Sequence, residues 1–193
     1  LPKHISIIMD GNRRYAADTG FAATPGHRAG KEKLEDVMDW VLELGVPYLT
    51  VYALSTENIT SRKPDELEAL FDLYVEGLND LAKDERILNN KVKVQVAGRK
   101  DLLPERVLAA IDNTEKVTAE HDKFVFTVCL AYGSREEIIE AVRAIAADHA
   151  DGNIDLESID ETEISKRLWT GEMPDPDLVI RTSGEERISN FLL

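Results

Sequence analysis

The chain has 193 residues, of which 43% are hydrophobic and 31% are charged, and its formal net charge at pH 7 is −14. This composition is typical of one globular domain with a full core rather than of a disordered chain. The strong negative charge argues against a nucleic-acid partner, because phosphate backbones require a basic protein face. No apolar run approaches the roughly 20 residues that span a bilayer. The single cysteine, Cys129, cannot form an internal disulfide, so we expect a cytoplasmic protein.

Strand patterns alternate with helix patterns through the first half of the chain. Gly45 and Pro47 end the first helix pattern, because glycine favours a helix C-terminus and proline cannot continue a helix. Pro64 suits the first turn of the next helix. Valines that alternate with polar residues at 91–97 predict a strand near a sheet edge. In chain order we predict a strand at 5–9, a helix from about 27 to 44, a strand at 48–54, a polar loop at 55–63, a helix at 64–82 and a strand at 91–97.

The second half of the chain continues this alternation. The run at 124–130 is apolar throughout, which is typical of a central strand in a parallel sheet. Ser134 and Glu137 match a capping box, which predicts a helix start. The predicted order is a helix at 104–117, the strand at 124–130, a helix from 134 to about 145, an acidic irregular stretch at 151–176 with a short helix near 164–169, and a strand at 177–182. This alternation predicts a single α/β domain over 1–193, with a mostly parallel sheet flanked by helices.

Polar residues follow several of the predicted strands, and in a parallel sheet they gather at the edge where ligands bind. Asp10 suits a hard cation, whereas Arg13 and Arg14 present forked donors that suit phosphate oxygens. His27 and Arg28 stand at a predicted helix N-terminus, where a bound anion would offset their unfavourable interaction with the helix dipole. These residues predict a site for a polyanion and a divalent cation. The alternative, that Asp10 caps a helix and pairs with the arginines, stays open.

Four motifs in a fixed order resemble the cis-prenyltransferase family, also called Z-type polyprenyl or undecaprenyl diphosphate synthases. They are the segments 4–14, 26–30 (Gly-His-Arg-Ala-Gly), 52–58 (Tyr-Ala-Leu-Ser-Thr-Glu-Asn) and 177–193. The resemblance implies a parallel sheet flanked by helices, an apolar substrate tunnel and a homodimer. It also implies a Mg2+-dependent transferase that condenses isopentenyl diphosphate with an allylic prenyl diphosphate to make a cis-polyprenyl diphosphate. Release of such a lipid implies transient contact with the membrane surface.

The same resemblance assigns roles to residues. Asp10 is expected to be the magnesium-linked carboxylate, and Asn58 is expected to assist proton removal. The residues expected at the allylic diphosphate are Gly11, Asn12, Arg13, Arg14, Tyr15 and His27. The other residues expected to bind substrate are Ser55, Thr56, Glu57 and Arg62 from one loop, and Arg181, Arg187, Ile188 and Ser189 around isopentenyl diphosphate.

The chain departs from the family pattern at three places. Ala23 stands where family members often place an arginine, Ile59 replaces a frequent aromatic residue, and Arg62 comes one place late. The family normally continues past Leu193 into a strand whose glutamate gives magnesium a second carboxylate, so we expect a truncated chain. Phe124 is expected near the tunnel floor, although a core role is an equal alternative.

Two other functions compete with the enzyme. The first is a non-catalytic partner subunit of a cis-prenyltransferase complex. Asp10 and the paired arginines argue against it, because a silent subunit does not need them. The second is an unrelated phosphate-ester hydrolase on a similar sheet.

Overall fold

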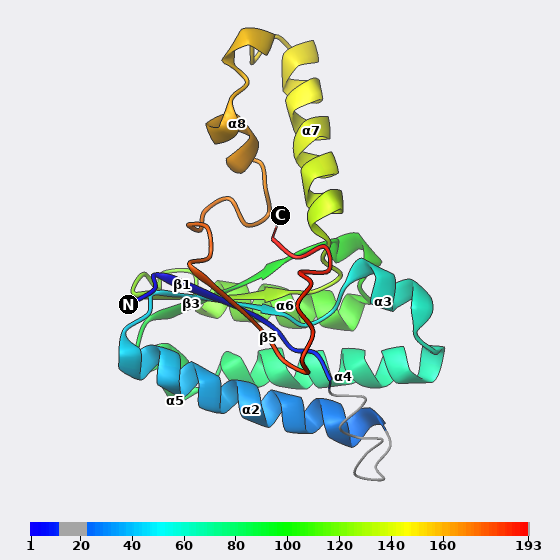
Figure 1. The fold of residues 1–193 in the computed structure, drawn as a ribbon, viewed down its shortest axis with the longest axis vertical. Coiled ribbons are helices and arrows are strands. Elements are labelled where there is room, and N and C mark those ends of the chain that lie inside the picture. The colour runs from blue at the N-terminus through cyan, green and yellow to red at the C-terminus, as the bar shows by residue number, and fades with distance from the viewer. Residues whose placement is uncertain (12–22, 193) are drawn as a thin grey trace.

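The computed structural model of the chain describes residues 1–11 and 23–192 (Figure 1). Within them, five strands form one sheet in the order β3-β4-β2-β1-β5, and every neighbouring pair is parallel. The strands are β1 (His4–Ile8), β2 (Tyr48–Tyr52), β3 (Val92–Ala97), β4 (Phe124–Cys129) and β5 (Leu178–Arg181). The predicted parallel α/β fold is confirmed, including the edge position of β3 and the interior position of β4.

Helices cover the two faces of the sheet unequally. The helices α2, α4 and α6 pack on one face, whereas α7 and α8 extend away from the opposite side (Figure 1). None of the helices in the described ranges is long and apolar enough to cross a membrane. The helical segments are α2 (Ala23–Leu44), α3 (Thr56–Ser61), α4 (Pro64–Leu81), α5 (Glu85–Asn89), α6 (Glu105–Val117), α7 (Ser134–Ala150) and α8 (Glu161–Ser165), with 3-10 turns η1 (Lys100–Leu102) and η2 (Leu156–Ser158).

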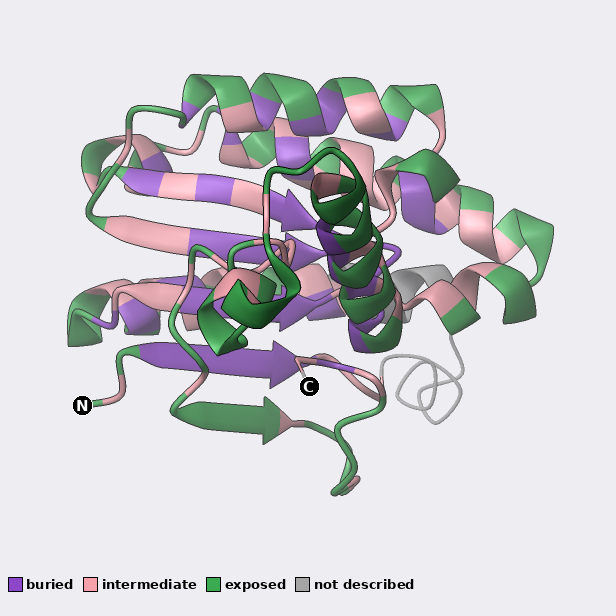
Figure 2. Ribbon diagram, turned by 90° about the horizontal axis from the view of Figure 1, so that it is seen from above, coloured by how far each residue is buried: buried purple, intermediate pink, exposed green. Residues whose placement is uncertain are grey.

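The two faces of the sheet differ in chemistry because strand side chains alternate between them. Ile5 and Ile7 of β1 face the helices and join the main core. His4 points to the other face, where it is buried and its ring nitrogens contact Thr50 Oγ1 at 2.8 Å and the carbonyl of Pro174 at 2.6 Å. The connection into β5 therefore covers a polar face whose groups are hydrogen-bonded. Figure 2 shows β1 buried and the neighbouring edge strand β5 exposed.

Several predicted boundaries are wrong. Helix α2 begins at Ala23, so His27 lies in its second turn rather than at its N-terminus, and the helix-dipole argument does not apply to it. The region predicted as the loop 55–63 contains α3, and α5 was not predicted. The short helix expected near 164–169 lies earlier, at α8.

The predicted capping box at the start of α7 is also wrong. Gly133 is the N-cap and Ser134 already lies inside the helix. Glu137 is buried and accepts hydrogen bonds from the Tyr132 hydroxyl and from the backbone and hydroxyl of Thr170. Glu137 thus fixes the base of α7 to the segment after α8, instead of capping its own helix.

Candidate functional site

The ends of β1 and β5 form the polar edge that the sequence predicts. Ile8 and Arg181 are partners in the parallel register, which brings the residues after them together. Arg181 Nη2 donates to Asp10 Oδ2 at 2.7 Å, and Thr182 Oγ1 donates to the Asp10 carbonyl at 2.5 Å. Asp10, which the sequence places at the centre of the site, is therefore held by the end of a strand that follows it by more than 160 residues in the chain.

Gly11 allows the loops after β1 and β5 to approach closely. Its φ of +92° lies in a region that residues with a side chain rarely adopt. A Cβ atom at this position would lie 2.6 Å from Ser183 Oγ. The role of Gly11 is thus to let Ser183 pack against the backbone beside Asp10. Ser183 was not predicted as a site residue, and only its position after a strand could have drawn attention to it.

Arg181 lies at the centre of a set of polar contacts, with only 10% of its side chain exposed. Its Nη1 donates to Ser189 Oγ at 2.7 Å and to the carbonyl of Arg187. The Nε atoms of Arg181 and of Arg62 are buried, and neither has a hydrogen-bond partner among the described residues. A buried donor without a partner costs roughly 1–3 kcal/mol. An anionic oxygen at either guanidinium would remove that cost.

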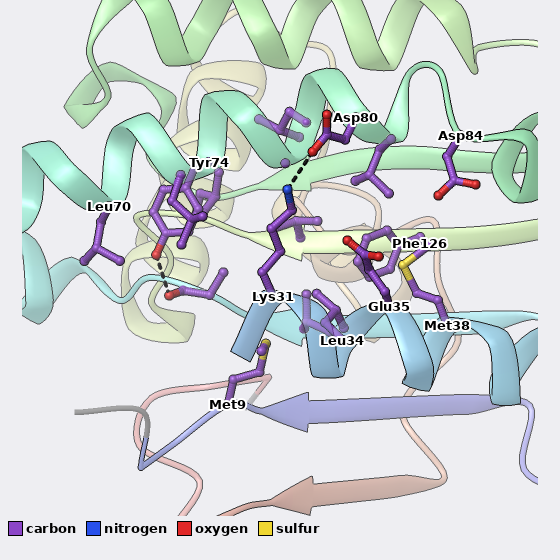
Figure 3. A pocket seen from close by; sticks show the side chains of 18 of the residues that line it. Met9, Lys31, Leu34, Glu35, Met38, Leu70, Tyr74, Asp80, Asp84 and Phe126 are labelled. Atoms are coloured by element: carbon purple, nitrogen blue, oxygen red, sulfur yellow. Dashed lines mark hydrogen bonds and ion pairs between the residues drawn. The ribbon is translucent and has the colours of Figure 1, made fainter. Parts of the chain in front are cut away.

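A cavity of about 240 Å³ is lined by Asp10 and by residues of α2, α4 and the sheet. Figure 3 shows side chains that line it. We call Met9, Asp10, Gly11 and Arg62 the mouth of this cavity. Its apolar interior is formed by Leu34 and Met38 of α2, by Leu70, Leu73, Tyr74, Leu78 and Leu81 of α4 and its end, and by Val51, Phe126, Val128 and Leu130 from the sheet side. The cavity therefore joins a charged mouth to a largely apolar interior, whose wall also contains Lys31, Glu35, Asp80 and Asp84.

Two aromatic residues define the interior more closely. The Tyr74 hydroxyl donates to the Ala53 carbonyl at 2.9 Å, so its ring forms the wall while its polar atom is satisfied (Figure 3). Phe126 lines the cavity. Phe124, expected near the tunnel floor or in the core, lines a smaller cavity of about 20 Å³ that shares Met38 and Phe126 with the larger one. Because side chains alternate along β4, Phe124 and Phe126, which are two residues apart, both point to the helix face.

The loop before α3 holds Asn58 in a defined orientation. Ser55 is the N-cap of α3, and its Oγ accepts hydrogen bonds from Asn58 N at 3.1 Å and Asn58 Nδ2 at 2.9 Å. Burial raises the pKa of Glu57, but hydrogen bonds from its own backbone, Ser55, Asn190 and Thr56 outweigh burial and lower that pKa. The three residues Ser55, Thr56 and Glu57 belong to one hydrogen-bonded turn. Neither they nor Asn58 line the cavity.

Asn190 connects this turn to the C-terminal segment, and the sequence-based prediction missed it. Its Nδ2 donates to Glu57 Oε1 at 3.1 Å and to Glu136 Oε2 at 3.2 Å. Its carbonyl and Oδ1 accept the backbone N–H groups of Ser134 and Arg135, each at 2.9 Å. Asn190 has φ of +61°, a conformation that asparagine tolerates better than most residues, but this angle is seen only in the structure.

Other predicted site residues lie apart or outside the described structure. The Arg187 guanidinium is exposed and pairs with Glu185, and Ile188 is also exposed. Asn12, Arg13, Arg14, Tyr15 and the side chain of His27 lie outside the described residues. Within the described ranges, no three His, Cys, Asp or Glu side chains form a ready metal site.

Comparisons with known proteins agree with this geometry. The prenyltransferase family model, described as that of undecaprenyl diphosphate synthases, matches residues 8–193. A tritrans,polycis-undecaprenyl-diphosphate synthase (geranylgeranyl-diphosphate specific) from Methanopyrus kandleri is 52% identical over 193 residues, covering 100% of this chain and 71% of that protein. A protein of the same name from Thermoplasma volcanium is 46% identical over 192 residues, covering 100% of this chain and 74% of its own length.

A solved structure is similar over the whole chain. Lavandulyl diphosphate synthase from Lavandula x intermedia, crystallised with dimethylallyl diphosphate, superposes with a TM-score of 0.92 at 32% sequence identity. The match covers 100% of this chain and 82% of that one.

Proposed function

Because this chain belongs to the undecaprenyl diphosphate synthase family and is a cis-prenyltransferase, we propose that it extends geranylgeranyl diphosphate with isopentenyl diphosphate units. The primer is the one that the names of its relatives specify. The observation that carries the proposal is the cavity, which joins a mouth containing Asp10 and Arg62 to an apolar interior. Such a cavity suits a ligand with an anionic head and a hydrocarbon tail. No comparison supports the alternative of a non-catalytic partner subunit.

The guanidinium groups would hold and stabilise the diphosphates. Arg62 and Arg181 each carry a buried Nε without a partner among the described residues, and guanidinium donors match phosphate oxygens. In the reaction the bond between the allylic carbon and its diphosphate oxygen breaks, a carbon–carbon bond to isopentenyl diphosphate forms, and a proton leaves. Negative charge grows on the departing diphosphate. Preorganised cations at the mouth stabilise that charge, while the apolar wall keeps water from the electron-poor carbon.

The mouth also fits a magnesium ion. Mg2+ is typically bound by one or two carboxylates together with substrate phosphates, so Asp10 alone is a sufficient protein ligand for a metal–diphosphate complex. When bound, magnesium would neutralise diphosphate charge and make it a better leaving group. Asp10 Oδ2 is kept in place by Arg181 at 2.7 Å, which orients the carboxylate toward the same edge as the arginines.

The remaining substrate contacts follow from the family resemblance. Ser189 holds Arg181 and is a proposed contact of isopentenyl diphosphate, together with Arg187 and Ile188. Asn58, fixed by Ser55, is proposed to assist proton removal by orienting isopentenyl diphosphate. Exposed apolar side chains on β5 and α7 support a proposed homodimer. A lipid product supports transient contact with a membrane surface.

The decisive test is an elongation assay with geranylgeranyl diphosphate and labelled isopentenyl diphosphate. We expect a series of labelled prenyl diphosphates that disappears when magnesium is removed with EDTA. Asp10→Ala should lose the products and keep the folded circular dichroism spectrum. Labelled products that persist in EDTA would refute the magnesium assignment. Absence of elongation by the folded wild-type protein with magnesium would refute the proposed function.

A further inference from the structure

Ion pairs join α2 and α4, two helices that form the wall of the apolar cavity. Lys31 of α2 extends toward α4, where its Nζ donates to Asp80 Oδ2 at 2.6 Å and to Glu76 Oε1 at 3.2 Å (Figure 3). We call the line along which α2 and α4 face each other at the cavity the seam. We call Lys31, Glu76 and Asp80 the seam ion pair. Lys31 and Asp80 both line the cavity. The seam ion pair is therefore part of the cavity wall and not a remote surface contact.

The lysine is more buried than its partners. Only 20% of the Lys31 side chain is exposed, compared with 60% for Asp80. The stem of Lys31 lies against α4, since a Cβ atom at Gly77 would be 3.8 Å from Lys31 Cε. Burial lowers the pKa of Lys31, but the hydrogen bonds and charges of Asp80 and Glu76 outweigh it and raise that pKa. Lys31 is thus a charged group in a largely apolar wall, and its carboxylate partners keep it charged.

A second group of ion pairs joins α2 to α5, farther along α2 from the seam. Arg86 of α5 donates to both carboxylate oxygens of Asp39 at 3.1 Å, approaches Glu35 at 3.7 Å, and also pairs with Asp84. Glu35 and Asp84 line the cavity as well. These ion pairs supplement the apolar contacts of α2, since Met38 lies in one buried core cluster with Leu70 and Leu78 of α4.

The volume of the cavity relates the contact between α2 and α4 to the length of the prenyl product. Sites for drug-sized ligands measure about 300–1,000 Å³, and this cavity measures about 240 Å³. A prenyl chain that grows by repeated addition will fill it and then press on its walls. The sheet side is tightly hydrogen-bonded, with β2 and β4 paired along their whole length. The seam is the wall in which charged pairs stand beside the apolar contacts between helices.

We propose that Lys31 is a specificity-determining residue whose ion pair with Asp80 and Glu76 holds the seam closed and limits the length of the prenyl product. This inference rests on the proposed function and adds to it the wall position at which a growing chain is stopped. When the seam ion pair is present, elongation ends once the chain reaches the wall at Lys31. When it is absent, α2 and α4 separate and the chain passes between them, so further units are added.

The test compares the product lengths of the wild type and four variants, Lys31→Met, Lys31→Ala, Asp80→Asn and Lys33→Met, by chromatography after dephosphorylation. Lys31→Met keeps an unbranched stem but removes the positive charge, and Asp80→Asn removes the negative charge from the shorter of the two contacts. Lys33→Met is the matched control, because Lys33 lies on the same helix but pairs with Asp36 at the surface and does not line the cavity. We expect the main product of Lys31→Met to be longer by at least one isoprene unit. Asp80→Asn should shift it in the same direction by less, and Lys33→Met should leave it unchanged.

The failure of this inference differs from failure of the proposed function. If the wild type elongates and Lys31→Met gives the wild-type distribution, the role of the ion pair is refuted. If Lys31→Ala lengthens the product while Lys31→Met does not, the bulk of the stem and not its charge limits the length, which also refutes the proposal. If the folded wild type makes no prenyl product, the proposed function itself fails. Circular dichroism of each variant establishes that it is folded before product lengths are compared.

Discussion

The mouth of the cavity and the seam both contain a mostly buried cation held by carboxylate, yet they differ in what remains unsatisfied. Beside the mouth, Arg181 donates to Asp10 and Ser189, while its buried Nε has no partner among the described residues. At the seam, Lys31 is shared between Asp80 and Glu76. A cation whose buried donor lacks an acceptor can bind an anionic ligand. A cation whose donors already contact two carboxylates instead links the two helices that carry these groups. What distinguishes a binding cation from a structural one here is whether all of its donors have hydrogen-bond acceptors, and not whether it is an arginine or a lysine.

The largest effect should come from Asp10→Asn at the mouth. The amide keeps the shape of the carboxylate but loses the charge that would hold magnesium and that pairs with Arg181. We expect kcat to fall by on the order of 10³-fold, comparable to removal of a main electrostatic stabiliser. The melting temperature should change by only a few degrees. Steady-state kinetics at saturating magnesium measure the effect, and a variant that keeps more than a tenth of the wild-type kcat would contradict the role of Asp10.

A smaller loss of activity, measured as kcat/KM for isopentenyl diphosphate, is expected for Arg181→Lys. Lysine keeps the positive charge but lacks Nε and the forked geometry of the guanidinium. Hydrogen bonds to charged groups contribute about 1.5–3 kcal/mol, which corresponds to roughly a 10- to 150-fold change in kcat/KM for isopentenyl diphosphate. Arg99→Lys is the matched control, because Arg99 forms a two-bond pair with Asp101 away from the cavity mouth. Equal kinetic effects of the two substitutions would show that the unmet donor of Arg181 has no ligand.

The sequence predicts this mouth better than it predicts the seam. Asp10 and Arg181 each stand at the end of a strand pattern, and parallel strands place their ends at one edge. That rule, together with the family motifs, brings together residues that are 171 positions apart. Lys31 and Asp80 stand within helix patterns, in which polar residues ordinarily face solvent. Whether two such side chains meet depends on how the helices pack, and helical periodicity does not contain that information.

The N-terminus of α2 and the N-cap of α7 were predicted wrongly because the local sequence pattern does not decide either of them. Thr24-Pro25-Gly26 favours a loop, yet proline is accepted in a first helical turn because the N–H groups there have no partner within the helix. The helix therefore begins at Ala23. The capping box at Ser134 failed because Asn190, far along the chain, already binds the first N–H groups of α7. A cap supplied by a distant segment leaves no local pattern.

A third prediction tests the close approach of the two loops at the mouth. Gly11→Ala adds backbone strain at φ of +92° and a clash with Ser183, whereas Gly152→Ala adds strain at φ of +73° where no atom lies within 4 Å. Strain alone costs about 1–2 kcal/mol. Urea unfolding should therefore show a larger loss for Gly11→Ala than for Gly152→Ala, and only Gly11→Ala should reduce kcat/KM. Equal losses of stability would mean that Ser183 moves away without cost.

The smallest effect concerns the stability contributed by the seam ion pair. Its carboxylates are exposed, so Lys31→Met should lower the free energy of unfolding by no more than about 1 kcal/mol. The pKa of Lys31 is raised in the folded protein above its ordinary value of about 10.4, so the folded state binds the proton more tightly than the unfolded state does. The contribution is therefore complete below pH 10.4 and is lost as pH rises through the folded pKa.

The stability difference between wild type and Lys31→Met, measured by urea unfolding, should consequently shrink between pH 8 and strongly alkaline pH. Other groups titrate in both proteins and cancel in the difference. The Lys33→Met control should show no such change, because no charge on that side chain is shared between α2 and α4. A difference that stays constant with pH would mean that the methionine stem, and not the lost charge, accounts for the change in stability. In that case the seam would be closed by packing, and its contrast with the mouth would disappear.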